Sequence, residues 1–204
     1  SFSKPVRITD RFFILPPDIE SIAGPNDIDI RIIAGISFGT GHHPTTRLCL
    51  AALDRLFFST GASDHLQGRK AGDIGTGSGV LAIAACLAGM SRCTAWETDP
   101  NAVSEACRNV AANGLENRIN VIHDIMTPRD LRLSLVMANL RIPTLKQIAS
   151  DICSILVPGG YLILSGVRAW EMDDLKNYYR TMGFSIDWER EEKMWGALTL
   201  TKKE

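Results

Sequence analysis

Apolar positions follow two periods in alternation over most of the chain, which predicts strands alternating with helices from about residue 70 onward. The run LSLVMANL at 133–140 is nearly continuous in apolar residues, as expected of a parallel strand buried on both faces. Alternation of this kind predicts an α/β fold with a doubly wound, mostly parallel sheet. Strands are expected at 92–99, 117–124, 133–140 and 161–167, and helices at 78–89, 99–114, 144–160 and 169–183.

The two ends of the chain have a different pattern. Residues 184–202 alternate apolar and polar positions like an antiparallel hairpin, which adds antiparallel strands to the sheet. Residues 1–45 contain two short strand-like runs, RITDRFFILPP and DIDIRIIAG, separated by Pro and Gly. Because two short strands cannot form a core of their own, we expect 1–45 to be an N-terminal extension that packs on a main domain spanning 46–204.

Composition narrows the class of protein. Of 204 residues, 45% are hydrophobic and 22% are charged, and the net charge is −1. This balance argues against a direct nucleic-acid or membrane partner, and no apolar run approaches the ~20 residues of a membrane span. The five cysteines are odd in number and form no CxxC pair, so they are expected to be buried, reduced thiols of a cytoplasmic protein.

The stretch DIGTGSG lies where a strand is expected to pass into a helix. Gly75, Gly77 and Gly79 permit positive φ and close approach to a ligand, and Asp73 leads into the turn, so all four are candidate cofactor-binding residues. The spacing is GxGxG, and position 80 is Val80, so the GxGxxG pattern of dinucleotide-binding enzymes is not met. This pattern favours a cofactor cradle for something other than a nicotinamide dinucleotide; the alternative is a tight turn without a ligand.

Polar side chains follow the next three strands at the edge where such sheets bind ligands. Glu97 ends the second strand, where a carboxylate can accept both hydroxyls of a ribose. Asp124 follows the third strand and is expected near the adenine of a nucleoside cofactor, although it could simply initiate a turn. Asn139 ends the fourth strand, and its amide could orient an incoming amine or cap the next turn.

Five segments in order carry a specific resemblance. The GxGxG turn is similar to that of class I S-adenosylmethionine (AdoMet) methyltransferases, and the whole set resembles the PrmA family, the methyltransferases of ribosomal protein L-eleven. The resemblance implies a Rossmann-like sheet of seven strands and AdoMet as cofactor. It also implies a protein substrate whose lysine or α-amino groups are methylated, such as a ribosomal protein. The segments are SFGTGHHPTTRLCL, DIGTGSGVLAIAA, ETDPNAVSEACRNVAANG, VMANL and PGGYLILSG.

The resemblance also assigns residues. The glycine-rich and histidine-rich segment ISFGTGHHPTT (36–46) is expected to fold over the cofactor, with Thr46 contacting AdoMet and Phe38 closing an apolar wall. Asn139 is expected in the cofactor site and is our candidate catalytic residue. No metal is expected, because methyl transfer from a sulfonium needs none; of His42 and His43, one should cap or brace the loop and the other should be solvated.

Alternatives remain open at this stage. The methyl acceptor could be a small-molecule amine or another protein, or the chain could be a non-catalytic AdoMet-binding module. Base methylation in nucleic acid is disfavoured because Asn139 is followed by Leu-Arg instead of the Asn-Pro-Pro-aromatic pattern of such enzymes.

Overall fold

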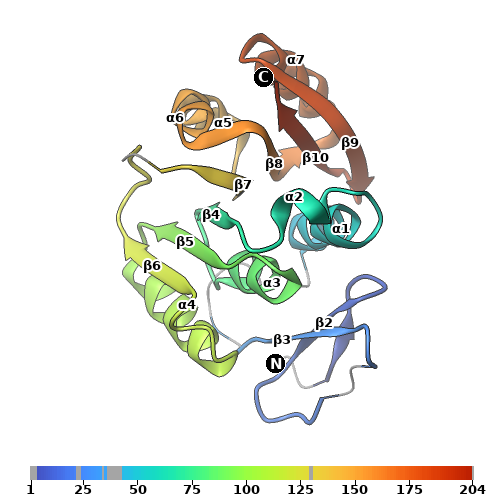
Figure 1. Cartoon of the computed structure of the whole chain (residues 1–204), viewed down its shortest axis with the longest axis vertical. Coiled ribbons are helices and arrows are strands. Elements are labelled where there is room, and N and C mark those ends of the chain that lie inside the picture. Colours follow the sequence, from blue (N-terminus) through green and yellow to red (C-terminus); the bar gives the residue numbers. More distant parts are fainter. Residues whose placement is uncertain (1–3, 22–23, 34, 36–42, 129–130, 204) are drawn as a thin grey trace.

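The computed structural model describes residues 4–21, 24–33, 35, 43–128 and 131–203. Its centre is a seven-stranded sheet in the order β6-β5-β4-β7-β8-β10-β9 (Figure 1). Strands β4 to β8 run parallel, whereas β10 is antiparallel to both β8 and β9, which confirms the predicted sheet and its C-terminal hairpin. The strands are β4 (Lys70–Ile74), β5 (Arg92–Glu97), β6 (Ile119–His123), β7 (Leu133–Asn139), β8 (Leu156–Arg168), β9 (Phe184–Glu192) and β10 (Trp195–Lys202).

Helices cover both faces of this sheet (Figure 1). One face carries α1 (Pro44–Phe58), α3 (Val80–Ala88) and α4 (Pro100–Ala112), and the other carries α5 (Ile142–Gln147), α6 (Ala149–Ile155) and α7 (Met172–Thr181). Two short helical segments complete the set, α2 (Ser63–Leu66) and the 3₁₀ turn η1 (Ala169–Glu171). Each face has its own hydrophobic cluster, and alternate side chains of β7 supply both, Leu135 and Met137 to the first and Val136 and Ala138 to the second.

Local signals set the ends of α4 as the sequence predicts. The Asp99 side chain caps the helix by accepting a hydrogen bond from the Asn101 N–H at 2.8 Å, and Pro100 is its first residue. Beyond its last turn, Gly114 adopts φ 65°, a conformation that ends a helix at little cost for glycine.

Two expectations from the sequence are wrong. The single helix expected at 144–160 is instead α5 and α6, and β8 already begins at Leu156. Leu145, Ala149 and Ile152 are all buried at helical spacing, so the apolar period continues across the break and does not reveal it. Cys107 is exposed on α4, whereas Cys49, Cys86 and Cys93 are buried as expected; all five thiols are free.

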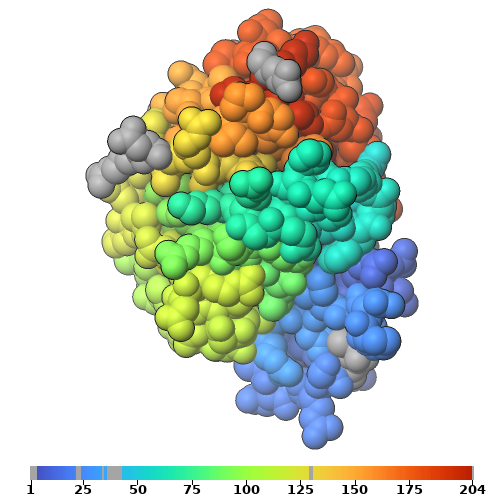
Figure 2. All heavy atoms as spheres, in the orientation of Figure 1, coloured from blue at the N-terminus to red at the C-terminus, as the bar shows by residue number. Residues whose placement is uncertain are grey.

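The N-terminal segment forms a small sheet of its own, seen as the blue lobe in Figure 2. In it β1 (Val6–Arg7) pairs antiparallel with β2 (Phe12–Leu15), and β2 pairs parallel with β3 (Ile28–Arg31). Side chains from β2 and β3 belong to the same hydrophobic cluster as α1 and α3. The division into 1–45 and 46–204 stays a prediction. None of the helices in the described part of the chain is long and apolar enough to cross a membrane.

Candidate functional site

The glycine turn joins β4 to α3 at the carboxyl edge of the sheet. Gly75, Gly77 and Gly79 have φ of 72°, 56° and 83°, a region that other residues enter at a cost. The N–H groups of Gly75 and Thr76 both donate to the Trp96 carbonyl at the end of β5, at 2.9 and 3.0 Å. The turn is therefore tied to the neighbouring strand, and its positive φ angles match the sequence prediction.

Glu97 fixes the turn from the other side. Its Oε2 accepts a hydrogen bond from the Gly77 N–H at 2.9 Å, and its Oε1 accepts from the N–H groups of Thr98 and Asp99 at 2.8 and 3.1 Å. Each carboxylate oxygen has two lone-pair directions, so these contacts leave acceptor capacity on the carboxylate. Glu97 thus shapes the glycine turn and still presents charge beside it.

A cavity of about 720 Å³ opens at this edge of the sheet, lined by the ends of β4, β5, β6 and β7 and by α5 and α6. Of the predicted site residues, Gly75, Gly77, Glu97, Asp124 and Asn139 line it together. Asp99 and Asp151 add two more carboxylates, and none of the lining residues in the described ranges is Lys, Arg or His. A cavity with this charge favours a cationic ligand.

Asp124 lines the cavity, and its Oδ1 also accepts a hydrogen bond from the N–H of the next residue, Ile125, at 2.7 Å. Ile125 beside it is 63% exposed and lines the same cavity, so this wall combines an acceptor with bare apolar surface.

Asn139 is the end residue of β7, paired with Ser165 of β8. Its Oδ1 is buried and has no hydrogen-bond partner among the described residues, although its side chain lines the cavity. A buried amide oxygen without a partner costs free energy, so natural structures rarely keep one without a reason. The orphaned oxygen at the cavity wall is the feature here that points most directly to a ligand.

The start of α1 lies near the same edge. Pro44 is its first residue, as predicted, and the His43 side chain caps it by accepting from the Thr45 N–H at 3.3 Å, so His43 is the histidine that braces the loop. Thr46 is 1% exposed and its hydroxyl has no partner among the described residues, yet it does not line the cavity. Phe38 and His42 lie outside the described residues.

The next turn of α1 shows how close this helix is to the glycine turn. Burial and the nearby Asp73 carboxylate both raise the pKa of the Cys49 thiol, and a hydrogen bond with the Ser165 side chain opposes them. Cys49 therefore lies near Asp73 of β4 and Ser165 of β8, one turn beyond Thr46.

Besides Thr46, two predicted site residues do not line the cavity. Asp73 is 1% exposed, and its Oδ2 accepts hydrogen bonds from Thr76 Oγ1 at 2.6 Å and from the Ala82 N–H at 3.2 Å, so it braces the glycine turn from beneath. Gly79 is the N-cap of α3, where an added Cβ would meet Ala106 of α4 at 3.5 Å. Both support the cavity wall from behind.

Asp73 gives a pH-dependent prediction. Burial raises the pKa of its carboxyl from 3.8 to about 6, against hydrogen bonds from Thr76 and Ala82 that lower it. Since the folded protein holds this proton more tightly, its stability contribution is complete below about pH 4 and is lost as pH rises through about 6. We expect Asp73→Asn, which keeps an acceptor, to gain stability relative to wild type over this window, by up to about 3 kcal/mol. Urea unfolding of both proteins at pH 4 and pH 7 measures the difference in their free energies of unfolding. The same difference at both pH values would contradict a raised pKa of Asp73.

Gly166 also shapes this region, although the sequence pattern did not single it out. It follows Ser165 at the carboxyl end of β8 with φ 86°, and an added Cβ would lie 2.5 Å from the Leu140 carbonyl oxygen. Leu140 comes directly after Asn139 and donates its N–H to the Ser165 carbonyl at 3.0 Å. Gly166 therefore allows the Asn139–Leu140 segment to approach β8. The quoted run PGGYLILSG contained the signal, a glycine at a strand end, but no local pattern names its partner.

Comparison with known proteins places these features in a family. The model of the ribosomal protein L11 methyltransferase (PrmA) family matches residues 1–203. A ribosomal protein L11 methyltransferase from Geotalea uraniireducens (strain Rf4) is 37% identical over 201 residues, which cover 97% of this chain. The chain spans 64% of the length of that relative.

Solved structures share the fold. A ribosomal protein L11 methylase from Lactobacillus delbrueckii subsp. bulgaricus superposes with a TM-score of 0.83 at 24% identity, covering 98% of this chain and all of that one. An RNA methyltransferase from Salinibacter ruber, crystallised with S-adenosyl-L-homocysteine, gives a TM-score of 0.61 at 17% identity over 79% of this chain and 95% of its own. With the family model matching almost every residue, this chain belongs to the ribosomal protein L11 methyltransferase (PrmA) family.

Proposed function

We propose that this chain is an AdoMet-dependent methyltransferase domain that transfers methyl groups to amino groups, of lysine or of the chain N-terminus, in ribosomal protein L11. The observation that carries the proposal is the unpartnered Asn139 amide oxygen in the wall of an acidic cavity beside the glycine turn. Family membership supports the acceptor, since the relatives in this comparison are named for it.

The residues of the cavity fit the proposed cofactor. AdoMet supplies a methyl group on a positively charged sulfonium, and the carboxylates in the lining favour a cation. Glu97 would bind the ribose hydroxyls, Asp124 would lie near the adenine, and the backbone at Gly75 and Gly77 would lie against the amino-acid portion. Thr46, whose buried hydroxyl has no partner among the described residues, would hydrogen-bond the cofactor, and Phe38 would close an apolar wall beside it.

Asn139 would orient the acceptor. Its Oδ1 can accept an N–H of the incoming amine and so direct the nitrogen lone pair toward the methyl group. A neutral amide suits this task better than a carboxylate, because a carboxylate would hold the amine in its protonated, unreactive form. Proton loss from the amine would be favoured by desolvation and by the nearby positive charge; the chain needs no nucleophile of its own.

A transfer assay tests the proposal. The purified chain is incubated with AdoMet and ribosomal protein L11, and methylation of L11 is read by mass spectrometry. We expect L11 to gain one or more methyl groups on amines. AdoMet binding without transfer to L11 would contradict the acceptor assignment and favour either a different amine or a non-catalytic module.

We expect Asn139 to be needed for methyl transfer although its buried amide oxygen lowers the stability of the folded chain. In Asn139→Leu the orphaned oxygen is gone, so we expect the free energy of unfolding to be unchanged or higher, by up to about 2 kcal/mol, while methyl transfer is lost. The matched control is Asn109→Leu. Asn109 is 1% exposed, more buried than Asn139 as a whole, and its amide is satisfied, accepting from the Ile33 N–H and donating to the Ser78 carbonyl, both at 2.8 Å, so its loss should destabilise. If both variants destabilise alike, Asn139 has a structural role.

A further inference from the structure

A second cavity lies away from the proposed active site, along the C-terminal half of α1. It measures about 740 Å³, and its walls are α1, the N-terminal segment that carries Thr9, and the edge strand β9. A side pocket of about 180 Å³ continues from it between α1 and the face of the sheet. Arg55, Thr60 and Trp188 line both spaces, so together they form one groove.

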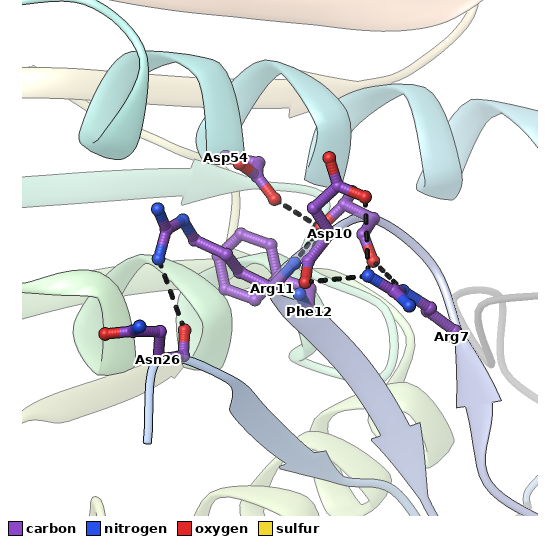
Figure 3. A network of polar contacts seen from close by, with 7 residues as sticks. Arg7, Asp10, Arg11, Phe12, Asn26 and Asp54 are labelled. Atoms are coloured by element: carbon purple, nitrogen blue, oxygen red, sulfur yellow. Dashed lines mark hydrogen bonds and ion pairs between the residues drawn. The ribbon is translucent and has the colours of Figure 1, made fainter. Parts of the chain in front are cut away.

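The acidic groups of this groove are already engaged. Asp54 accepts a hydrogen bond from the Thr9 hydroxyl, and Asp187 accepts one from Thr201. Asp10 forms an ion pair with Arg7 at 3.4 Å. Figure 3 shows this wall, with Asp54 of α1 pointing toward the N-terminal segment and Arg7 turned onto Asp10. Each carboxylate therefore has a donor of its own.

Two of the basic groups are not engaged. Arg55 of α1 and Arg190 of β9 both line the groove, and within the described ranges neither guanidinium has a hydrogen bond or an ion pair. Arg47, eight residues earlier on the same helix, does have a partner. It forms an ion pair with Glu192 of β9 at 3.1 Å. The lining carries three arginines and three aspartates, so its net charge is near zero, and the charged donors still available to a ligand are the guanidiniums of Arg55 and Arg190.

A buried hydroxyl points to the same place. Thr199 of β10 lines the side pocket together with Arg55, is 2% exposed, and its Oγ1 has no partner in the part of the chain that the structure describes. A hydroxyl buried in this way costs free energy unless something binds it. A guanidinium and a hydroxyl that line the same small pocket without partners form a pair of donors suited to an oxyanion.

We propose that this groove is a binding site for a small anionic ligand, whose phosphate or carboxylate group occupies the side pocket between Arg55 and Thr199. Arg190 lines the larger space beside this side pocket, where it adds long-range attraction for the anion. The site is separate from the acidic cavity at the carboxyl edge, which repels such a ligand. No residue that lines the groove also lines that cavity, within the described part of the chain.

An NMR titration of the full chain tests the site. Two-dimensional ¹H–¹⁵N spectra are recorded with sodium phosphate and, in a second series, with sodium acetate, each at constant ionic strength balanced by chloride. We expect saturable shifts at the backbone amides of 55, 60 and 199 with at least one of the two anions. Saturation by phosphate alone identifies a phosphate ligand, and saturation by acetate alone a carboxylate. No saturable shift with either would overturn the proposal.

Three variants complete the test. Arg55→Gln and Thr199→Val should each weaken the anion affinity about tenfold or more, by loss of a charge-assisted or buried hydrogen bond. Arg69→Gln, an exposed arginine remote from the groove, is the control and should leave affinity unchanged. Thr199→Val removes only an unpartnered hydroxyl, so it should fold normally. AdoMet affinity should be the same in all three, which separates this site from the proposed active site. Unchanged anion binding in both groove variants would overturn the assignment.

Discussion

Replacing Glu97 with alanine is expected to weaken AdoMet binding about 100-fold or more. A charge-assisted hydrogen bond from a ribose hydroxyl to the acceptor site that remains on Glu97 contributes on the order of 1.5–3 kcal/mol, and the variant loses it. It also frees the N–H groups of Gly77, Thr98 and Asp99, which Glu97 accepts from in the free protein, so the glycine turn loses the group that shapes it. Calorimetric titration with AdoMet measures the effect.

Two control variants separate the loss of the Glu97 side chain from the loss of a negative charge. Glu97→Gln keeps an acceptor oxygen but removes the charge, and we expect it to bind AdoMet with an affinity between those of the wild type and the alanine variant. Glu116→Ala removes an exposed acid outside the cavity and should change nothing. An affinity of Glu97→Ala within threefold of the wild-type value would show that this carboxylate does not bind the cofactor.

Gly166→Ala should have the largest effect on stability. The residue has φ 86°, which costs an alanine about 1–2 kcal/mol, and its Cβ would meet the carbonyl oxygen, carbonyl carbon and nitrogen of Leu140 at 2.5–2.8 Å. Backbone atoms cannot move aside as a side chain can, so overpacking adds about 1–3 kcal/mol. We expect the free energy of unfolding to fall by about 2–5 kcal/mol in total, measured by urea unfolding.

The same substitution should also disturb the cavity, because any shift of Leu140 moves Asn139 beside it. The matched control is Gly183→Ala. Gly183 has an almost identical φ of 87°, but nothing lies within 4 Å of an added Cβ, so only the conformational cost of about 1–2 kcal/mol should remain. Equal losses in the two variants would mean that the contact with Leu140 has no energetic importance.

The parts of the fold that could be predicted are those with local causes. Asp99 and Pro100 start α4 and glycines end it, because caps and φ preferences act within a few residues. The buried run of β7 and the alternation in β9 and β10 follow from burial on two faces or one. The glycine turn with Glu97 beside it was predictable because the ends of adjacent parallel strands meet.

Features that depend on distant contacts were not predictable. The break between α5 and α6 leaves the apolar period intact, so periodicity could not find it. Asp73 was expected to bind the cofactor, but its position beneath the turn depends on how α3 packs against β4. The role of Gly166 requires knowledge of the β7–β8 register, which pairs Asn139 with Ser165. The pairing of Arg47 with Glu192 likewise depends on how α1 lies across β9.

A crystal structure of this chain with S-adenosyl-L-homocysteine would test the central claim most directly. We expect the ligand in the cavity at the carboxyl edge, with its ribose at Glu97 and its amino-acid portion along Gly75 and Gly77, toward the start of α1. Ligand bound elsewhere, for example in the groove beside Arg55, or a cavity that stays empty at saturating ligand concentration would contradict it.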